Sequence, residues 1–161
     1  MVVAIIGVVS AVIMLSVTSS GRDRDLERES DRLYTLITYA REAAELQTRE
    51  YGIFFQEDGY EFLVYDVQRA KWRSVFEDDA LAARKLPNGL GVQLTVETRP
   101  VVLRRPVDAK DKTPQVMIYS NGDLTQFAAA LERDGGVRSV TVAEDDKGQV
   151  IEQPMVVARA Q

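Results

Sequence analysis

The first twenty residues form an uncharged and almost wholly apolar run, and the first ionisable side chain after this run is Arg22. A helix of twenty residues is about 30 Å long, which matches the hydrocarbon thickness of a bilayer. A helix that is apolar on every side is typical of a segment buried in lipid or among other helices. Residues 1–20 are therefore expected to form a helix held in a membrane, or in surroundings that substitute for one.

The apolar run continues without a linker into an amphipathic stretch over residues 21–50. One side of this stretch repeats with spacings of three, four and seven, the period of an α-helix, at Leu26, Leu33, Ile37, Ala40, Ala44 and Gln47. Gly21 is the one candidate break, and a lone glycine costs only about 1 kcal/mol relative to alanine. We predict one long helix over residues 1–50 whose second half packs on the rest of the chain through Leu33, Ile37, Ala40 and Ala44. The alternative is a spanning helix followed by a separate amphipathic helix.

Beyond Tyr51 the hydrophobic pattern changes to period 2, which is typical of half-buried strands. Strands are expected over residues 53–55, 60–65, 71–76, 92–96, 101–103, 115–119, 137–142 and 149–152. Residues 127–133 (FAAALER) have helical propensity, but the turns around them favour a strand. Residues 77–85 are expected to form a loop or single turn, and residues 105–114 an exposed loop. The predicted fold is α+β, with the helix packed on an antiparallel sheet or sandwich domain over residues 51–161.

Composition disfavours several classes of function. The chain has 20 basic and 25 acidic residues and a net charge of −5, whereas a nucleic-acid partner requires a basic surface. It has no cysteine, so neither a disulfide nor a zinc–thiolate site can form. It also has no histidine, which is the commonest general base and a frequent metal ligand. We therefore expect no nucleic-acid partner, no catalytic residue and no cofactor.

Several blocks of the sequence are similar to one known family. They are residues 1–12, 45–52 (ELQTREYG), 59–66 (GYEFLVYD) with Trp72 behind them, 86–90 (LPNGL) and 114–125 (PQVMIYSNGDLT). Through these blocks the chain resembles the type IV pilin superfamily and, within it, the minor pseudopilin H group of type II secretion (GspH/FimT-like). In that family a basic leader, a phenylalanine and a glutamate lie before or at the start of the apolar core, and none of them is present here. We expect a start that is truncated inside the core, and the assembly glutamate of the family cannot be carried over.

The resemblance implies a pilin-like fold and a structural subunit of the secretion pseudopilus, near the filament tip, that helps to export folded proteins across the outer membrane. It implies a single-pass protein of the bacterial inner membrane with its domain in the periplasm. The implied partners are the major pseudopilin, the other minor pseudopilins of the tip, the inner-membrane assembly platform, the secretin and secreted proteins. Small side chains would allow close helix packing in membrane or filament, at a surface comprising Ile5, Gly7, Val8, Ser10, Ala11 and Leu15. These residues are equally ordinary in any spanning helix.

Three other functions stay open. A minor pilin of a type IV pilus would share the architecture, but such pilins commonly carry a disulfide, so the absence of cysteine favours secretion. A single-pass, membrane-anchored periplasmic binding protein without a filament role would start at Met1, with no processing site before it. An enzyme is the least favoured because it would depend on perturbed carboxylates without any histidine.

Two acidic clusters are candidate metal sites. Residues 77–79 and 144–146 offer the carboxylate oxygens that Ca²⁺ prefers, but neither cluster has the spacing of a calcium loop. Solvated turns are therefore favoured and no metal is expected.

Three further groups of side chains are candidate contact sites. The alternating charges of residues 22–29 could pair between neighbours in a filament or form a solvated helix face. The polar side chains of the predicted loop (Asp108, Lys110 and Asp111) could contact a partner, although a solvated loop is favoured. The aromatic side chains at strand spacing could form a binding platform but are better explained as core: Tyr60, Phe62, Tyr65 and Trp72.

Overall fold

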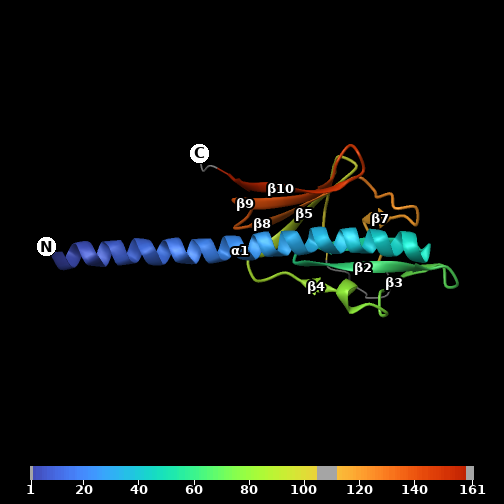
Figure 1. Ribbon diagram of the computed structural model, residues 1–161, viewed down its shortest axis with the longest axis horizontal. Coiled ribbons are helices and arrows are strands. Elements are labelled where there is room, and N and C mark those ends of the chain that lie inside the picture. Colours follow the sequence, from blue (N-terminus) through green and yellow to red (C-terminus); the bar gives the residue numbers. More distant parts are fainter. Residues whose placement is uncertain (1, 105–111, 159–161) are drawn as a thin grey trace.

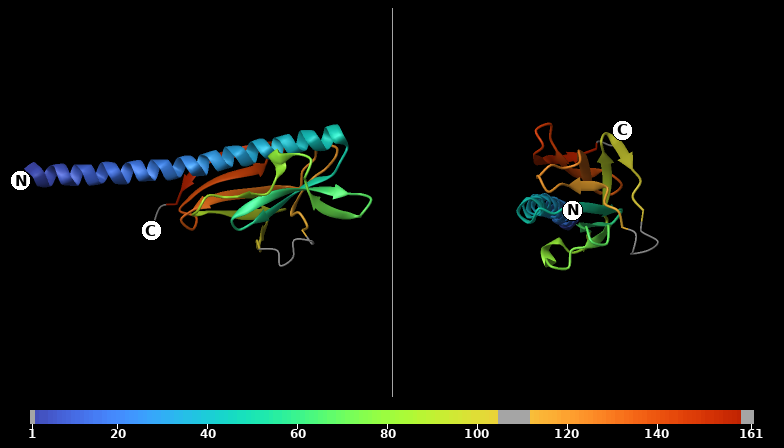
Figure 2. Two further views of the ribbon diagram at one scale, coloured as in Figure 1. Left: turned by 90° about the horizontal axis from the view of Figure 1, so that it is seen from below. Right: turned by 90° about the vertical axis from the view of Figure 1, so that its right-hand side faces the viewer.

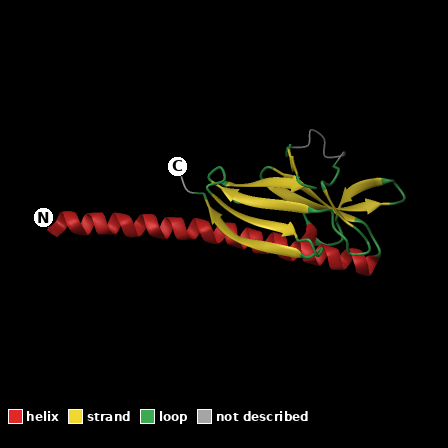
Figure 3. Ribbon diagram, turned by 90° about the horizontal axis from the view of Figure 1, so that it is seen from above, coloured by secondary structure: helices red, strands yellow, loops and turns green. Residues whose placement is uncertain are grey.

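One long helix and two antiparallel sheets make up the structure. The computed structural model describes residues 2–104 and 112–158, with the backbone alone for residues 2–23. The helix α1 (Val2–Gln47) extends well beyond the strands at its N-terminal end (Figure 1). All strands lie beside its C-terminal half (Figure 3). The predicted fold class, a long helix packed on antiparallel sheets, is confirmed.

The end of α1 is set by a backbone motif rather than by the hydrophobic pattern. The amide of Arg49 donates to the carbonyl of Ala44, and the amide of Thr48 donates to the carbonyl of Glu45. Thr48 has a positive φ of 51°, so these two bonds form the Schellman arrangement that commonly ends a helix. The helix therefore stops at Gln47 and not at residue 50.

The first sheet has the strand order β3-β2-β1-β7, and β4 pairs with β2 beside β3. Its strands are β1 (Tyr51–Gln56), β2 (Gly59–Asp66), β3 (Lys71–Ser74), β4 (Arg84–Lys85) and β7 (Val116–Ile118). In the β1–β2 hairpin Ile53 lies opposite Phe62 and Phe55 lies opposite Tyr60, so alternate residues face the core. Between β3 and β4, a short 3₁₀ turn, η1 (Asp79–Leu81), buries Leu81 where the sequence predicted a loop or single turn.

The second sheet has the order β10-β9-β8-β5-β6. Its strands are β5 (Leu90–Val96), β6 (Arg99–Val101), β8 (Phe127–Arg133), β9 (Arg138–Glu144) and β10 (Val150–Val157). The ambiguous segment 127–133 is a strand, as predicted, because every second residue is buried and tertiary packing outweighs its helical propensity.

A single hydrophobic core joins α1 to both sheets. Viewed nearly along α1, strands β9 and β10 lie on one side of the helix and the β2–β4 region lies on the other (Figure 2). Fully buried side chains come from the helix, the first sheet and the second sheet, for example Ile37, Phe62 and Leu131. The C-terminal half of α1 is therefore a structural member of the domain.

Candidate assembly interface

The helix α1 presents a buried face and an exposed face. Leu33, Ile37, Ala40 and Ala44 are all fully buried, so the structure places the four residues that were expected to pack on the β domain in its core. Gln47, at the end of the predicted stripe, is exposed and accepts a hydrogen bond from the Tyr51 hydroxyl at 3.0 Å. On the opposite face Tyr39 and Leu46 are exposed.

The packing surface predicted for the apolar half of α1 lies among residues whose backbone alone is described. The side chains of Ile5, Gly7, Val8, Ser10, Ala11 and Leu15 lie outside the described residues and stay a prediction. Within the described part of the chain, no helix is long and apolar enough to cross a membrane.

A buried charge lies on the packing face of α1. Glu29 is only 3% exposed and accepts hydrogen bonds from Nε and Nη2 of Arg84, both at 2.8 Å. Arg32 approaches the same carboxylate at 3.5 Å. Such two-point bonding compensates the loss of water around a carboxylate. The prediction of a solvated or intersubunit charge is therefore wrong for Glu29, because its helical position points into the domain.

Two other charged residues near the start of the domain lie on a solvated helix face, one of the two predicted alternatives. Asp25 and Arg28 form an ion pair of 3.7 Å whose side chains are largely exposed. The side chain of Asp23 lies outside the described residues, as do Asp108, Lys110 and Asp111 of the predicted contact loop.

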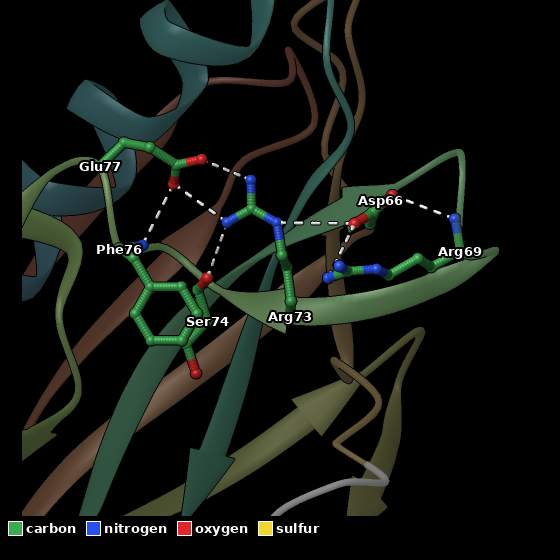
Figure 4. A network of polar contacts seen from close by, with 6 residues as sticks. All are labelled: Asp66, Arg69, Arg73, Ser74, Phe76 and Glu77. Carbon is green, nitrogen blue, oxygen red and sulfur yellow. Dashed lines mark hydrogen bonds and ion pairs between the residues drawn. The ribbon is translucent and has the colours of Figure 1, made fainter.

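The acidic cluster 77–79 is engaged within its own domain. Arg73 donates two hydrogen bonds to Glu77 and also lies 4.0 Å from Asp66 (Figure 4). The hydrogen bonds from Arg73 lower the pKa of the Glu77 carboxyl to about 2. Asp78 caps η1 and accepts a hydrogen bond from the Tyr39 hydroxyl, which connects η1 to α1.

The cluster 144–146 is part of a turn between β9 and β10. Asp145 accepts hydrogen bonds from the amides of Lys147 and Gln149, both at 2.8 Å. Burial raises the pKa of the Glu144 carboxyl. Among the residues that the structure describes, no group of three metal-binding side chains is arranged to hold an ion.

The four aromatic side chains divide between the two faces of the first sheet. Tyr60 and Phe62 are buried in the core, with ring centroids 6.1 Å apart. Tyr65 and Trp72 pair on the outer face, 5.3 Å apart and partly exposed. The assignment of all four to the core is therefore wrong for this pair, because residues 60 and 65 of one strand point to opposite sides.

The outer face of the first sheet carries a second buried charge that the sequence did not indicate. Glu61 is almost completely buried and accepts hydrogen bonds from the Ser74 hydroxyl and from the Lys112 ammonium group. Pro114 packs against Gly52 on the same face, where any larger side chain would clash with the proline ring. These contacts attach residues 112–114 to the sheet.

Exposed apolar side chains lie at the two ends of the domain. Val67 and Phe76 are exposed in and after the β2–β3 hairpin, toward the end of α1. Val137, Val156 and Val157 are exposed where the β9–β10 hairpin ends, toward the projecting half of α1 (Figure 1). The sequence pattern did not indicate these surfaces, because it does not show which apolar residues the rest of the fold leaves uncovered.

Comparison with known proteins identifies relatives that match over most of the chain. Type II secretion system protein H of Pseudomonas aeruginosa is 31% identical over 150 residues, which cover 89% of this chain and 85% of that protein. Type II secretion system protein H of Aeromonas hydrophila is 26% identical over 158 residues, which cover 93% and 86% of the two chains. No established family profile matches the chain.

A solved structure shows the same fold. The crystal structure of the minor pseudopilin EpsH from the type II secretion system of Vibrio cholerae superposes with a TM-score of 0.70 at 16% identity. The match covers 80% of this chain and 95% of that one. The common architecture is the one described above, a helix packed on antiparallel sheets.

Proposed function

The chain belongs to the type II secretion system protein H family, and from this premise we propose that it is a minor pseudopilin, a structural subunit of the secretion pseudopilus. The subunit waits in the bacterial inner membrane, anchored by residues 1–20, with its β domain in the periplasm. It then enters a short filament near the tip and helps to export folded proteins across the outer membrane. This role requires no catalytic group and no cofactor.

The observation that carries this proposal is the continuity of α1. Its 46 residues span about 69 Å at 1.5 Å per residue. Leu33 and Ile37, in its second half, are fully buried in the domain core. A force applied to the apolar half is therefore transmitted to the domain through one rigid element, as filament assembly requires.

The composition of the apolar half suits both states of such a subunit. A helix that is apolar all round satisfies its backbone internally and is stable in lipid. It is equally stable among like helices, so transfer from bilayer to filament need not expose it to water. Small residues such as Gly7, Ser10 and Ala11 favour close approach of a neighbouring helix.

The proposed partners follow from these two states. In the membrane the subunit meets the inner-membrane assembly platform, and in the filament it contacts the major pseudopilin and the other minor pseudopilins. At the tip it lies close to the secretin and to secreted proteins. The relatives named above support assembly within this system, and the individual contacts belong to the proposal.

Cross-linking tests the proposal directly. The chain contains no cysteine, so a single introduced thiol reports one position without interference. Ser10→Cys, combined with single cysteines in the apolar helix of the major pseudopilin, is expected to form an intersubunit disulfide in cells that produce the whole secretion system. Gln93→Cys, exposed on β5, controls for indiscriminate oxidation. Failure of every such pair to cross-link, in cells that still secrete, would refute the filament role.

A further inference from the structure

We propose that the open end of the β9–β10 hairpin, opposite its turn, lies in the phospholipid headgroup layer of the inner membrane while the subunit awaits assembly. This end carries Val137, Val156 and Val157. We call these three residues the basal valines. The inference builds on the proposed function, because it takes residues 1–20 to be the membrane anchor. It adds a second, reversible membrane contact made by the β domain itself.

The basal valines make both faces of this end of the hairpin apolar. Their exposed fractions are 46% for Val137, 62% for Val156 and 57% for Val157. Val157 is paired with Arg138, and the amide of Ala158 donates to the carbonyl of Val137 at 2.8 Å. The three residues therefore lie close together at one end of the two strands, with Val156 and Val157, successive residues of β10, on opposite faces. Single exposed valines are common on proteins, whereas three at one end of a hairpin leave both of its faces apolar there and indicate a contact site.

The position of this surface favours a lipid partner. The end of β10 and the start of β9 lie at the end of the domain from which the N-terminal half of α1 projects (Figures 1 and 3). Leu26 is the first buried side chain among those described on α1, six residues after the last residue of the apolar run. Six helical residues correspond to about 9 Å, and the headgroup layer on each side of a bilayer is about 5–8 Å thick. The base of the domain therefore lies at the outer edge of the headgroup layer.

The arrangement also predicts a direction of tilt. The basal valines lie on one side of α1, so their contact with lipid would incline the helix toward β10. Membrane helices tilt by about 20° on average, and residues at the interface set the direction. A tilt of this size brings the hairpin end closer to the acyl chains without bending α1.

Charge contributes little to this contact. The charged side chains near the base are of both signs, with Arg24 and Arg28 on α1 against Asp25 and Glu27 on the same helix and Asp134 in the β8–β9 turn. Burial of the valines, and not attraction to anionic lipid, would hold the surface in place. The contact should therefore persist at high salt, unlike a contact made by a basic patch.

Tryptophan quenching in the full chain tests the inference. Trp72 is the only tryptophan, and Trp72→Phe gives a silent background. A Val137→Trp or Val156→Trp reporter is then placed in vesicles of phosphatidylethanolamine and phosphatidylglycerol that contain lipid with a nitroxide on its headgroup. Val67→Trp is the matched control, since Val67 is 80% exposed in the β2–β3 turn at the far end of the domain. Both basal reporters should be quenched several-fold more strongly than this control, at low and at high salt.

The outcomes separate this inference from the function on which it builds. If the protein floats with the vesicles but the basal and distal reporters are quenched equally, residues 1–20 still anchor the protein and the lipid contact of the valines is refuted. The valines would then be available for contact with a neighbouring subunit in the filament. If the protein does not float with the vesicles at all, the membrane-anchored state itself is refuted. Val156→Asp combined with Val157→Asp should reduce quenching of the Val137→Trp reporter, and unchanged quenching would also overturn the inference.

Discussion

Glu29 of α1 and Arg84 of β4 form a partly buried two-point ion pair, with both nitrogen–oxygen distances at 2.8 Å. The pair ties the long helix to β4 of the first sheet. The carboxylate side chain is only 4% exposed, whereas the arginine side chain is 33% exposed. Removal of the arginine would therefore leave the buried carboxylate with only the 3.5 Å contact of Arg32, while removal of both charges would leave no buried charge.

We expect Arg84→Ala to lower the free energy of unfolding by about 3 kcal/mol, the low end of the range for a buried pair that loses one partner, because Arg84 is one-third exposed and Arg32 stays near the carboxylate. Unfolding of the full chain in urea, followed by the fluorescence of Trp72, measures the change. Glu29→Leu combined with Arg84→Leu should recover most of the loss, because apolar replacement of both partners leaves no buried charge. Arg28→Ala, which removes the exposed pair with Asp25, is the matched control and should change stability by less than about 1 kcal/mol. Equal losses for Arg84→Ala and Arg28→Ala would contradict this account.

The ion pair between Arg73 and Glu77 predicts a pH dependence of known sign. The hydrogen bonds from Arg73 lower the pKa of Glu77 from 4.5 to about 2. A carboxyl whose pKa is lower in the folded state stabilises the fold above its unfolded pKa, and this contribution disappears as the pH falls from about 4.5 toward about 2. The Glu77 side chain is 55% exposed, so solvent screening keeps the effect on stability small.

Carboxyl NMR titration measures this shift more directly than unfolding does. Glu77 should titrate near pH 2, and Arg73→Ala should return its midpoint toward the ordinary value. Arg69→Ala is the control, because Arg69 contacts Asp66 and not Glu77. A native Glu77 midpoint near 4.5 would show that the ion pair does not form in solution.

The elements of the fold were predictable where the hydrophobic period was long and regular. The stripe that includes Leu33 and Ile37 predicted the packing helix, and the turns around residues 127–133 predicted a strand there against its own propensity. The order of strands was not predictable, because β7 pairs with β1 across more than fifty intervening residues. No local pattern specifies a pairing between segments so far apart in sequence.

The burial of Glu29, the outward position of Tyr65 and Trp72 and the exposure of the basal valines were not predicted. Each depends on which residues of the folded chain pack against that side chain. Glu29 has the composition of a solvated helix face, and its partner Arg84 lies 55 positions away. Tyr65 and Trp72 have the aromatic character of a core, yet the register of β2 directs them to the outer face. Val156 and Val157 lie beyond the strand predicted over residues 149–152, and their exposure depends on where β10 ends in the fold.

An unpaired hydroxyl in the core gives a further prediction. The oxygen of Tyr60 is buried and has no hydrogen-bond partner among the described residues, and burial raises the pKa of its phenol. A buried polar group without a partner costs about 1–3 kcal/mol, so Tyr60→Phe should leave stability unchanged or increase it. The aromatic contacts with Phe55 and Phe62 would be kept.

Urea unfolding of the two single variants Tyr60→Phe and Tyr51→Phe provides the comparison. The Tyr51 hydroxyl donates to Gln47 at 3.0 Å, so its removal should cost about 0.5–1.5 kcal/mol. A larger loss for Tyr60→Phe than for Tyr51→Phe would mean that the Tyr60 hydroxyl has a partner in solution.

The continuity of α1 through Gly21 links the fold to the proposed function. Proline removes a backbone donor and clashes with the preceding turn, which costs about 3 kcal/mol in a helix interior. Gly21→Pro should leave urea unfolding of the domain unchanged, because buried contacts on the described part of α1 start at Leu26. It should nevertheless strongly reduce secretion of a reporter exoprotein in cells that lack the native subunit, since the two halves of the helix would no longer move together. Gly21→Ala, which favours the helix by about 1 kcal/mol, is the matched control and should restore secretion fully. Full secretion with Gly21→Pro would show that rigid coupling is not needed and would remove the observation that carries the proposed role.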